Sequence, residues 1–450
     1  MASKPNQPRF YKRWAFWCVV VIAMPSVLTV IVLLSGANRY AEKLAELRAQ
    51  DRPTNLKELV AAYYVLPDGT PSATDQWVAA IQSLDQASIE AVVDVLPYIG
   101  NPDAAKPGDD WAELQAAQKF VAEQAGTYQL IREAIATEGA IQFDAPFSIN
   151  AATSSIQQVQ DLRQLTRLLC LDSAVAFEGQ DYDRVYKNTL GIFSMVNACR
   201  FEVTFLGQLT RCALANTALD QVSLYASHCD WNDAQLLSLQ KAIALPDYRQ
   251  AYTRAAFAQQ AFGLEVMDAS MPYATIGNAP QLMLIKSIER QTNSVKGPWH
   301  QAIAVHMEIE ADLNSRSGLI DQIRLHPLRL TSITSLSIIN SFAGSAARQR
   351  CAIAGLAAER QSRGEGQFAE TLDQVSDEYF PEKSDSQRLT DPFSGKPLKF
   401  VATGQLVQVY SVGKNQQDDS GRLEMEGDSP DWDIGFQIRK KPMNSADDRQ

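Results

Sequence analysis

The histidines offer the first arrangement that could do chemistry. His306 and Glu310 are four positions apart in a segment with helical periodicity, so both side chains would lie on one helix face, with His300 nearby. An imidazole beside a carboxylate can transfer protons or bind a transition metal. A solvated helix face with an ion pair explains the spacing as well, and we favour it because only four histidines are present.

Enzyme motifs are otherwise missing from the sequence. It has no phosphate-binding glycine loop, no dinucleotide-binding glycine motif, no HExxH zinc motif and no GxSxG nucleophile elbow. Gly344-Ser345 lacks the flanking residues of such an elbow. We therefore predict no catalytic residue and favour a non-catalytic protein, with a hydrolase whose site is assembled from distant residues as an alternative.

The six cysteines give no metal-binding pattern. None of them forms a CxxC pair, so zinc and thioredoxin-like chemistry have no support: Cys18, Cys170, Cys199, Cys212, Cys229 and Cys351. Outside the cytoplasm a disulfide could form among the three at 199, 212 and 229. Each lies among Leu, Ala and Val, where a free cysteine serves as a small core residue, and we favour that role.

Composition limits the classes of partner. The apolar content of 46% and charged content of 21% are those of a globular chain. The net charge of −11 argues against nucleic acid or anionic lipid as the main partner. A core of ordinary size follows from the length, because some 410 residues lie outside the apolar N-terminal stretch.

An uncharged stretch from Trp14 to Ala37 has the length of a membrane span. As a helix it reaches more than about 30 Å, the thickness of a bilayer's hydrocarbon core. Four basic residues precede it: Lys4, Arg9, Lys12 and Arg13. The positive-inside rule then places residues 1–13 in the cytoplasm and the bulk of this single-pass protein in the periplasm.

A cleaved signal peptide is the competing explanation of this stretch. Ser35-Gly36-Ala37 would serve as a small-residue cleavage site. The apolar regions of signal peptides run only about 7–15 residues, however, and this one is longer, so we favour an uncleaved anchor. Both explanations place the bulk outside the cytoplasm.

Helical periodicity dominates the middle of the chain. Four helices with short connections between Ser155 and Pro246 predict antiparallel neighbours, with Asn232 capping the fourth. Another helix is expected over 247–269, then a loop-rich stretch of about thirty residues punctuated by Met271-Pro272, Gly277, Pro280 and Gly297-Pro298. Two further helices are predicted, over 299–314 and 328–360.

The C-terminal part changes to β-favouring runs over 398–401, 406–412 and 434–438. In the central run, Leu406, Gln408 and Tyr410 alternate with Val407 and Val409, which gives the strand one face to bury and one to expose. We predict a mainly α fold, divided into a cytoplasmic tip (1–13), a transmembrane anchor (14–37), an irregular helical-hairpin domain (38–330), a long helix with a small antiparallel β module packed on it (331–438) and a disordered tail (439–450).

Four motifs follow in order within this C-terminal part: Phe368–Asp373, Asp391–Leu398, Val409–Gly413 and Asp431–Ile434. Their order resembles the C-terminal half of the major (G-type) pseudopilins of type II secretion, over roughly residues 335–438. Pseudopilins, however, carry a Glu in a membrane helix that runs straight into the globular part. Here the apolar span has no acidic residue and lies far from the matching helix, so the chain is not an ordinary pilus subunit.

The pseudopilin resemblance implies a calcium-binding loop. Asp431 and Asp433 match the family's terminal acidic ligands, and Asn415 stands where an Asp is usual. Hard oxygen ligands on a loop suit calcium. An acidic, solvated loop is the alternative, since five more carboxylates lie there: Asp418, Asp419, Glu424, Glu426 and Asp428. We expect no other cofactor.

The layout as a whole resembles a group of membrane-anchored helical proteins of planctomycete-type bacteria, for which the resemblance implies no activity. We predict a scaffold that is held at the cytoplasmic membrane by residues 14–37 and binds a protein or envelope partner through its helical hairpins. A structural component of a secretion or pilus-like assembly is a further alternative.

Overall fold

The computed structural model describes residues 36–100, 107, 109–144, 149–270, 278–315, 318, 335–381, 387–423 and 432–439, together with Trp17. This part of the chain is mainly helical with one small antiparallel sheet, as predicted. The predicted tip, almost all of the predicted span over 14–37, and the predicted tail over 439–450, apart from its first residue Arg439, lie outside the described residues. None of the helices in the described ranges has the length and apolar character needed to span a bilayer.

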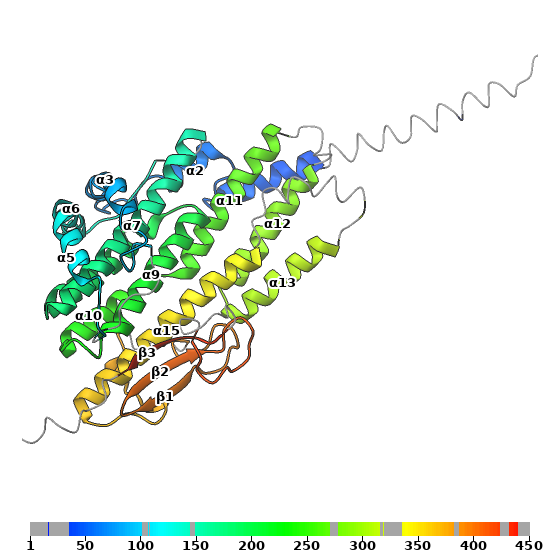
Figure 1. Ribbon diagram of the computed structural model, residues 1–450. Coiled ribbons are helices and arrows are strands. Elements are labelled where there is room, and N and C mark those ends of the chain that lie inside the picture. Colours follow the sequence, from blue (N-terminus) through cyan, green and yellow to red (C-terminus); the bar gives the residue numbers. More distant parts are fainter. Residues whose placement is uncertain are drawn as a thin grey trace, which may run out of the picture.

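The N-terminal part of the described chain consists of short helices. Residues 36–49 are helical, and five more helices follow: α2 (Leu56–Tyr63), α3 (Thr74–Gln82), α4 (Gln86–Glu90), α5 (Leu114–Glu123) and α6 (Ala125–Ala136). Asn55 starts α2 by accepting a hydrogen bond from the Glu58 amide, and Asp85 caps α4 in the same way. In Figure 1, α3, α5 and α6 gather at one end of the molecule, and α3 and α5 pack on α7.

The four predicted helical neighbours are confirmed. They are α7 (Ile149–Glu178), α8 (Tyr182–Ala198), α9 (Phe205–Tyr225) and α10 (Asp233–Ala244), with a short 3-10 turn, η1 (Cys199–Phe201), between α8 and α9. Asp181 caps α8 directly after Gln180, whose φ of 58° turns the chain. Asn232 and Gln235 form a reciprocal capping box at the start of α10. Helix α8 packs on both α7 and α9, and α10 packs on α8 rather than on its predecessor α9.

The loop-rich stretch predicted after residue 270 is wrong in its second half. A helix, α12 (Ala279–Ser294), lies between α11 (Tyr248–Ser270) and α13 (Trp299–Ser315). Pro280 does not break this helix because it occupies the first turn, where its missing N–H needs no partner. Leu284, Ile285 and Ile288 then form a buried stripe.

Helix α15 (Ser335–Glu365) is the centre of the fold. It packs against α9, α10, α11 and α13, and the sheet lies along another side of it (Figure 1). Two short 3-10 turns follow it, η3 (Leu372–Gln374) and η4 (Asp377–Tyr379). The sheet approaches α15 so closely that a Cβ on Gly355 would stand 2.8 Å from the Phe436 Cδ1.

The sheet has the order β1 (Lys399–Thr403), β2 (Leu406–Ser411) and β3 (Ile434–Arg439), all antiparallel. Packing of β2 and β3 on α15 confirms the predicted β module. The prediction that one face of β2 would be exposed is wrong, because Gln408 and Tyr410 are buried. The chain after β2 covers that face: the Gln408 amide donates to the Gly421 carbonyl, and the Tyr410 hydroxyl donates to Asp418 at 3.3 Å.

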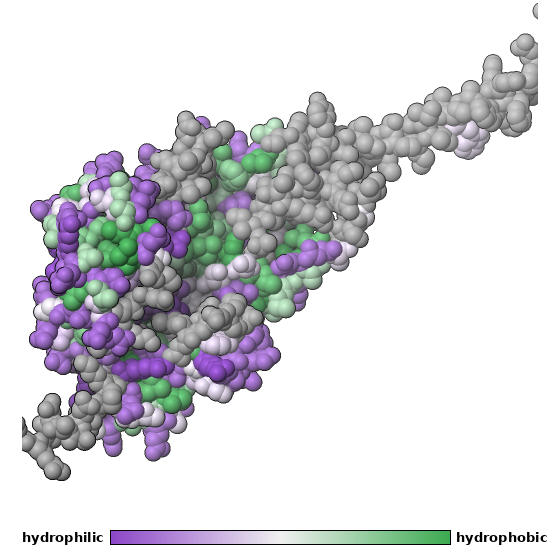
Figure 2. Space-filling view, viewed as in Figure 1, coloured by the Kyte–Doolittle hydropathy of each residue, from purple (hydrophilic) through white to green (hydrophobic). Residues whose placement is uncertain are grey.

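One apolar core joins the two predicted units. A single cluster of buried side chains runs from Trp77 on α3, through α7–α10, to Val409 and Phe436 in the sheet. The predicted boundary near residue 330 lies outside the described residues. Five cysteines in the described part, from Cys170 to Cys351, are buried and free, as favoured from the sequence. Figure 2 views the molecule from the same side as Figure 1. On that side hydrophilic residues lie around most of the surface and hydrophobic ones toward its middle.

Candidate functional site

His306 and Glu310 do not form the predicted solvated face. His306 is fully buried on α13, with its Nδ1 2.8 Å from the Ala302 carbonyl oxygen and its Nε2 2.7 Å from the Tyr252 hydroxyl. Burial lowers the pKa of His306, so the ring stays neutral. Both ring nitrogens are engaged inside the core. The ring is therefore part of a buried polar network that continues from Tyr252 to Gln291 at 3.0 Å.

His300 faces a different part of the molecule. A Cβ on Gly395 would stand 2.6 Å from the His300 ring, so the ring packs against the turn that begins at Asp391. That turn is held by the Asp391 carboxylate, which accepts hydrogen bonds from four groups: the Phe393 amide at 2.8 Å, the Ser394 hydroxyl at 2.8 Å, the Ser411 hydroxyl at 2.6 Å and the Val412 amide at 3.2 Å. The structure thus keeps His300 and His306 apart.

The described residues do not assemble the calcium site implied by the pseudopilin resemblance. Asp433 is fully buried; its Oδ2 accepts from the Gly421 amide at 2.8 Å, and its Oδ1 has no partner with ordinary hydrogen-bond geometry. The Asn415 Oδ1 accepts a hydrogen bond from the Gln417 amide at 2.9 Å, and its Nδ2 donates to the Asp419 Oδ2 at 3.0 Å. No group of three His, Cys, Asp or Glu residues in the described part is placed to hold a metal ion, and Asp431 lies outside that part.

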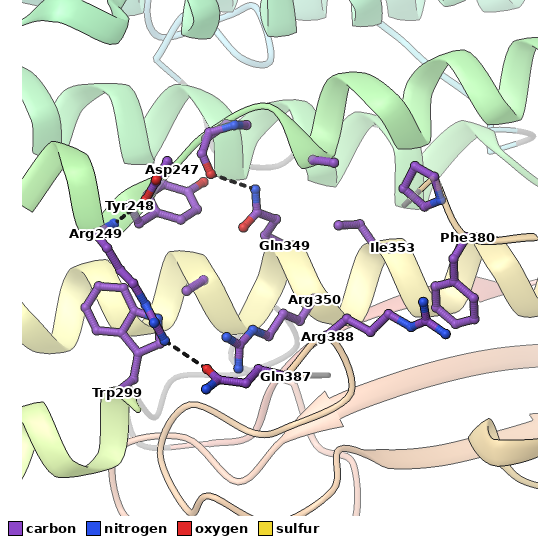
Figure 3. Close-up of a pocket in the computed structure, with 14 residues that line it drawn as sticks. Asp247, Tyr248, Arg249, Trp299, Gln349, Arg350, Ile353, Phe380, Gln387 and Arg388 are labelled. Atoms are coloured by element: carbon purple, nitrogen blue, oxygen red, sulfur yellow. Dashed lines mark hydrogen bonds between the residues drawn. The ribbon is translucent and has the colours of Figure 1, made fainter. Parts of the chain in front are cut away.

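A cleft of about 450 Å³ opens where α10 passes into α11, beside the start of α13 and the middle of α15 (Figure 3). We name it the arginine cleft because three half-buried arginines line it, from three separate parts of the chain: Arg249 on α11, Arg350 on α15 and Arg388 after η4. Asp247 is the one acidic residue in its lining among the described residues. Apolar side chains, including Pro246, Ile353 and Phe380, complete it.

Aromatic rings and neutral oxygens fix two of these arginines. The Arg249 guanidinium lies 5.5 Å from the centre of the Trp299 ring, and its Nη2 donates to the Gln387 Oε1 at 3.0 Å (Figure 3). Arg350 donates from Nη1 to the Thr390 carbonyl at 2.7 Å. Stacking and hydrogen bonding already restrict the rotamers of these arginines. Each arginine therefore loses less conformational entropy when it binds a ligand.

The third arginine is partly neutralised. The Arg388 guanidinium stacks 4.0 Å above the Phe380 ring and forms an ion pair with Asp377. Asp377 is itself largely exposed, with 67% of its side chain accessible, so water screens this pair. Arg388 therefore still contributes positive charge to the cleft.

Local rules explain why the chain turns here. Pro246 follows the end of α10, and Asp247 begins α11 by accepting hydrogen bonds from the Arg249 amide at 2.9 Å and the Gln250 amide at 3.0 Å. Gln349 ties the turn to α15, because its Nε2 donates to the Pro246 carbonyl at 3.0 Å. The backbone that carries Arg249 is thereby held against the central helix.

Sequence reasoning missed this cleft. Its arginines are at positions 249, 350 and 388, and no motif or charge run marks any of them. Their convergence depends on α11 and α15 packing together, a long-range contact that spacing along the chain does not report.

The arginine cleft is suited to binding an anion. A guanidinium presents a planar fork of donors that matches a carboxylate or phosphate, and a charge-assisted bond in a partly desolvated cleft is stronger than one in water.

No protein-family model, curated protein or solved structure matches the chain significantly. The resemblance to pseudopilins therefore stays a prediction.

Proposed function

We propose that the chain is a non-catalytic binding protein that holds an anionic segment of a partner protein in the arginine cleft. One observation carries this proposal: three arginines from distant parts of a chain with a net charge of −11 converge on a cleft whose described lining has a single acid. Carboxylates of a partner would complement the charge of these guanidinium groups.

We further propose that the body is held at the outer surface of the cytoplasmic membrane by the predicted anchor. The helical residues 36–49, which directly follow the predicted span, are fixed to the body. Tyr40 donates to Asp268 at 3.2 Å, and Lys43 forms an ion pair with Glu289 at 3.0 Å. An anchor joined in this way would keep the cleft at a short, constrained distance from the bilayer. Finding the full-length chain in the supernatant after carbonate extraction of membranes would contradict the proposed membrane anchor.

The two alternatives gain less support. A filament subunit would use the pseudopilin-like helix for assembly, but α15 is already surrounded by α9, α10, α11, α13 and the sheet. A hydrolase would need its acid–base group at a cleft, and His306 is fully buried and engaged on both nitrogens.

Binding of a short acidic peptide tests the proposal. We would titrate the full chain, in detergent, into fluorescein-labelled hexaglutamate and follow the fluorescence anisotropy. Arg350→Gln should weaken binding about tenfold, because it removes one charged donor. Arg163→Gln is the matched control, since Arg163 is exposed on α7 and its Nη1 donates to Gln160. Equal affinity of the two variants would refute the site.

A further inference from the structure

A second cleft adjoins the first and shares two residues with it. It has a volume of about 440 Å³ and lies where α11 meets the end of α2, η1 and the end of α12. Asp247 and Arg249 line both clefts. The two cavities therefore meet at the first turn of α11, with Arg249 between them.

The second cleft is also basic. Besides Arg249 it is lined by three more cations, Arg200, Arg254 and Lys296, and among the described residues Asp247 is again its one acid. Arg254 lies 4.5 Å above the Tyr63 ring, and Arg200 lies 4.8 Å above the Phe201 ring. The stacked-arginine arrangement of the arginine cleft thus recurs next to it.

Neutral oxygens hold these arginines. Arg254 donates to the Phe201 carbonyl at 3.1 Å and to the Tyr63 carbonyl at 2.7 Å. Arg200 donates to the Asn197 carbonyl at 2.9 Å. The ion pairs found in the described ranges include neither of these two arginines nor Arg249. Their positive charge has no direct carboxylate partner there.

A buried arginine behind the second cleft adds to the positive potential. Arg211 on α9 is only 4% exposed and donates from Nε to the Val196 carbonyl at 2.9 Å. Burial lowers the pKa of Arg200, and repulsion from the charge of Arg211 lowers it further. An anion in the second cleft would relieve this repulsion.

We propose, on the basis of the proposed function, that the two clefts form one continuous groove that binds an extended acidic polypeptide segment across Arg249. The six lining cations supply donors along its length, and the apolar lining at Ile353, Phe257 and Val295 suits the aliphatic parts of a polypeptide. A sulfated polysaccharide offers anions without such apolar groups.

Length dependence of binding tests the continuous groove. The probes are fluorescein-labelled peptides of alternating Glu and Ala, with six or twelve residues. Extended, they reach about 20 Å and about 40 Å. If the longer peptide occupies both clefts at once, its second half binds intramolecularly, and we expect it to bind at least tenfold more tightly to the full chain.

Variants of the second cleft complete the test. Arg254→Gln should lower the affinity for the twelve-residue peptide about tenfold and reduce its advantage over the six-residue peptide. Lys296→Gln, at an exposed position that does not threaten folding, should give a smaller loss in the same direction. Arg163→Gln again serves as the control, and the melting temperature of each variant checks its fold.

The outcomes separate the two proposals. If both peptides bind equally, or if Arg254→Gln leaves the longer one unaffected, the continuous groove is refuted. The arginine cleft then stands if Arg350→Gln still weakens the shorter peptide. If neither peptide binds, both proposals fail. Tighter binding of dextran sulfate than of the twelve-residue peptide would overturn the assignment to a polypeptide.

Discussion

Arginines in two regions of the molecule are treated differently. Within the helical body, Arg184 donates from Nε to Asp172 at 2.9 Å, and Arg360 donates to both oxygens of Asp233 at 2.7 and 3.0 Å. At the two clefts, Arg249 and Arg254 donate to amide and carbonyl oxygens. Arg184 and Arg360 are thus neutralised within the body, whereas Arg249 and Arg254 keep positive charge that a ligand could use.

This difference separates structural charge from charge available to a ligand. A buried carboxylate compensates the charge of its arginine within the fold, and removing one of the two leaves the other charge buried and unpaired. A guanidinium held by neutral oxygens is oriented but keeps its charge. We therefore expect the stability of the fold to depend on the ion pairs and packing of the body, and not on the arginines of the clefts.

The largest effect is expected at the Arg184–Asp172 pair. Arg184→Ala would leave the fully buried Asp172 carboxylate with Asn188, whose Nδ2 donates to it at 2.8 Å. Removing one partner of a fully buried pair costs about 3–5 kcal/mol of unfolding free energy, and because the Arg184 side chain is 38% exposed we expect a loss at the low end, about 3 kcal/mol. Urea denaturation of the full chain in detergent would measure this loss. Arg163→Ala should change stability by less than about 0.5 kcal/mol, and a similarly small loss for Arg184→Ala would remove the contrast.

Packing gives the next largest effect. Gly355→Ala adds a methyl group 2.8 Å from the Phe436 Cδ1, between α15 and the sheet. Overpacking of this kind costs about 1–3 kcal/mol, and thermal unfolding would show it as a lower melting temperature. Gly404→Ala is the control, because nothing lies within 4 Å of its added Cβ. Unchanged melting of Gly355→Ala would mean that the sheet sits loosely on α15.

Local chemistry made the body predictable from the sequence. Asn232 caps α10 as expected, because capping involves residues only a few positions apart. Pro280 misled the prediction, since proline both interrupts a helix and begins one, and the difference lies in the turn it occupies. The burial of Gln408 was missed because the segment that covers it has no periodic pattern from which its position could be predicted.

The clefts were not predictable in the same way. Arg249, Arg350 and Arg254 carry no common motif, and their role depends on which oxygen each one meets after α11 packs on α15 and on α2. Long-range packing decides whether an arginine finds a carboxylate, so composition gave only the net charge of −11 and no hint of a local positive groove.

A smaller, pH-dependent effect is expected in the core. Because burial lowers the pKa of His306, the unfolded chain takes up a proton near pH 6.5 that the folded chain refuses. Stability should therefore fall as pH drops through about 6.5 toward the folded pKa, by at most about 1.4 kcal/mol per pH unit. His306→Gln should reduce the pH dependence of the urea midpoint between pH 7 and 5.5, whereas the control Arg163→Gln should leave it unchanged. A slope that persists in His306→Gln would place the titrating group elsewhere.

The smallest effect on stability is expected at Arg254. Arg254→Gln loses two hydrogen bonds to the Phe201 and Tyr63 carbonyls, yet it also removes a cation whose pKa is lowered by burial. The two contributions oppose each other, so the free energy of unfolding should change by less than about 1 kcal/mol. Urea denaturation beside peptide binding on the same sample measures both quantities. A loss of stability as large as that of Arg184→Ala would show that Arg254 is a structural arginine, and the contrast between body and clefts would end there. Unchanged stability with weakened binding would assign its charge to a ligand.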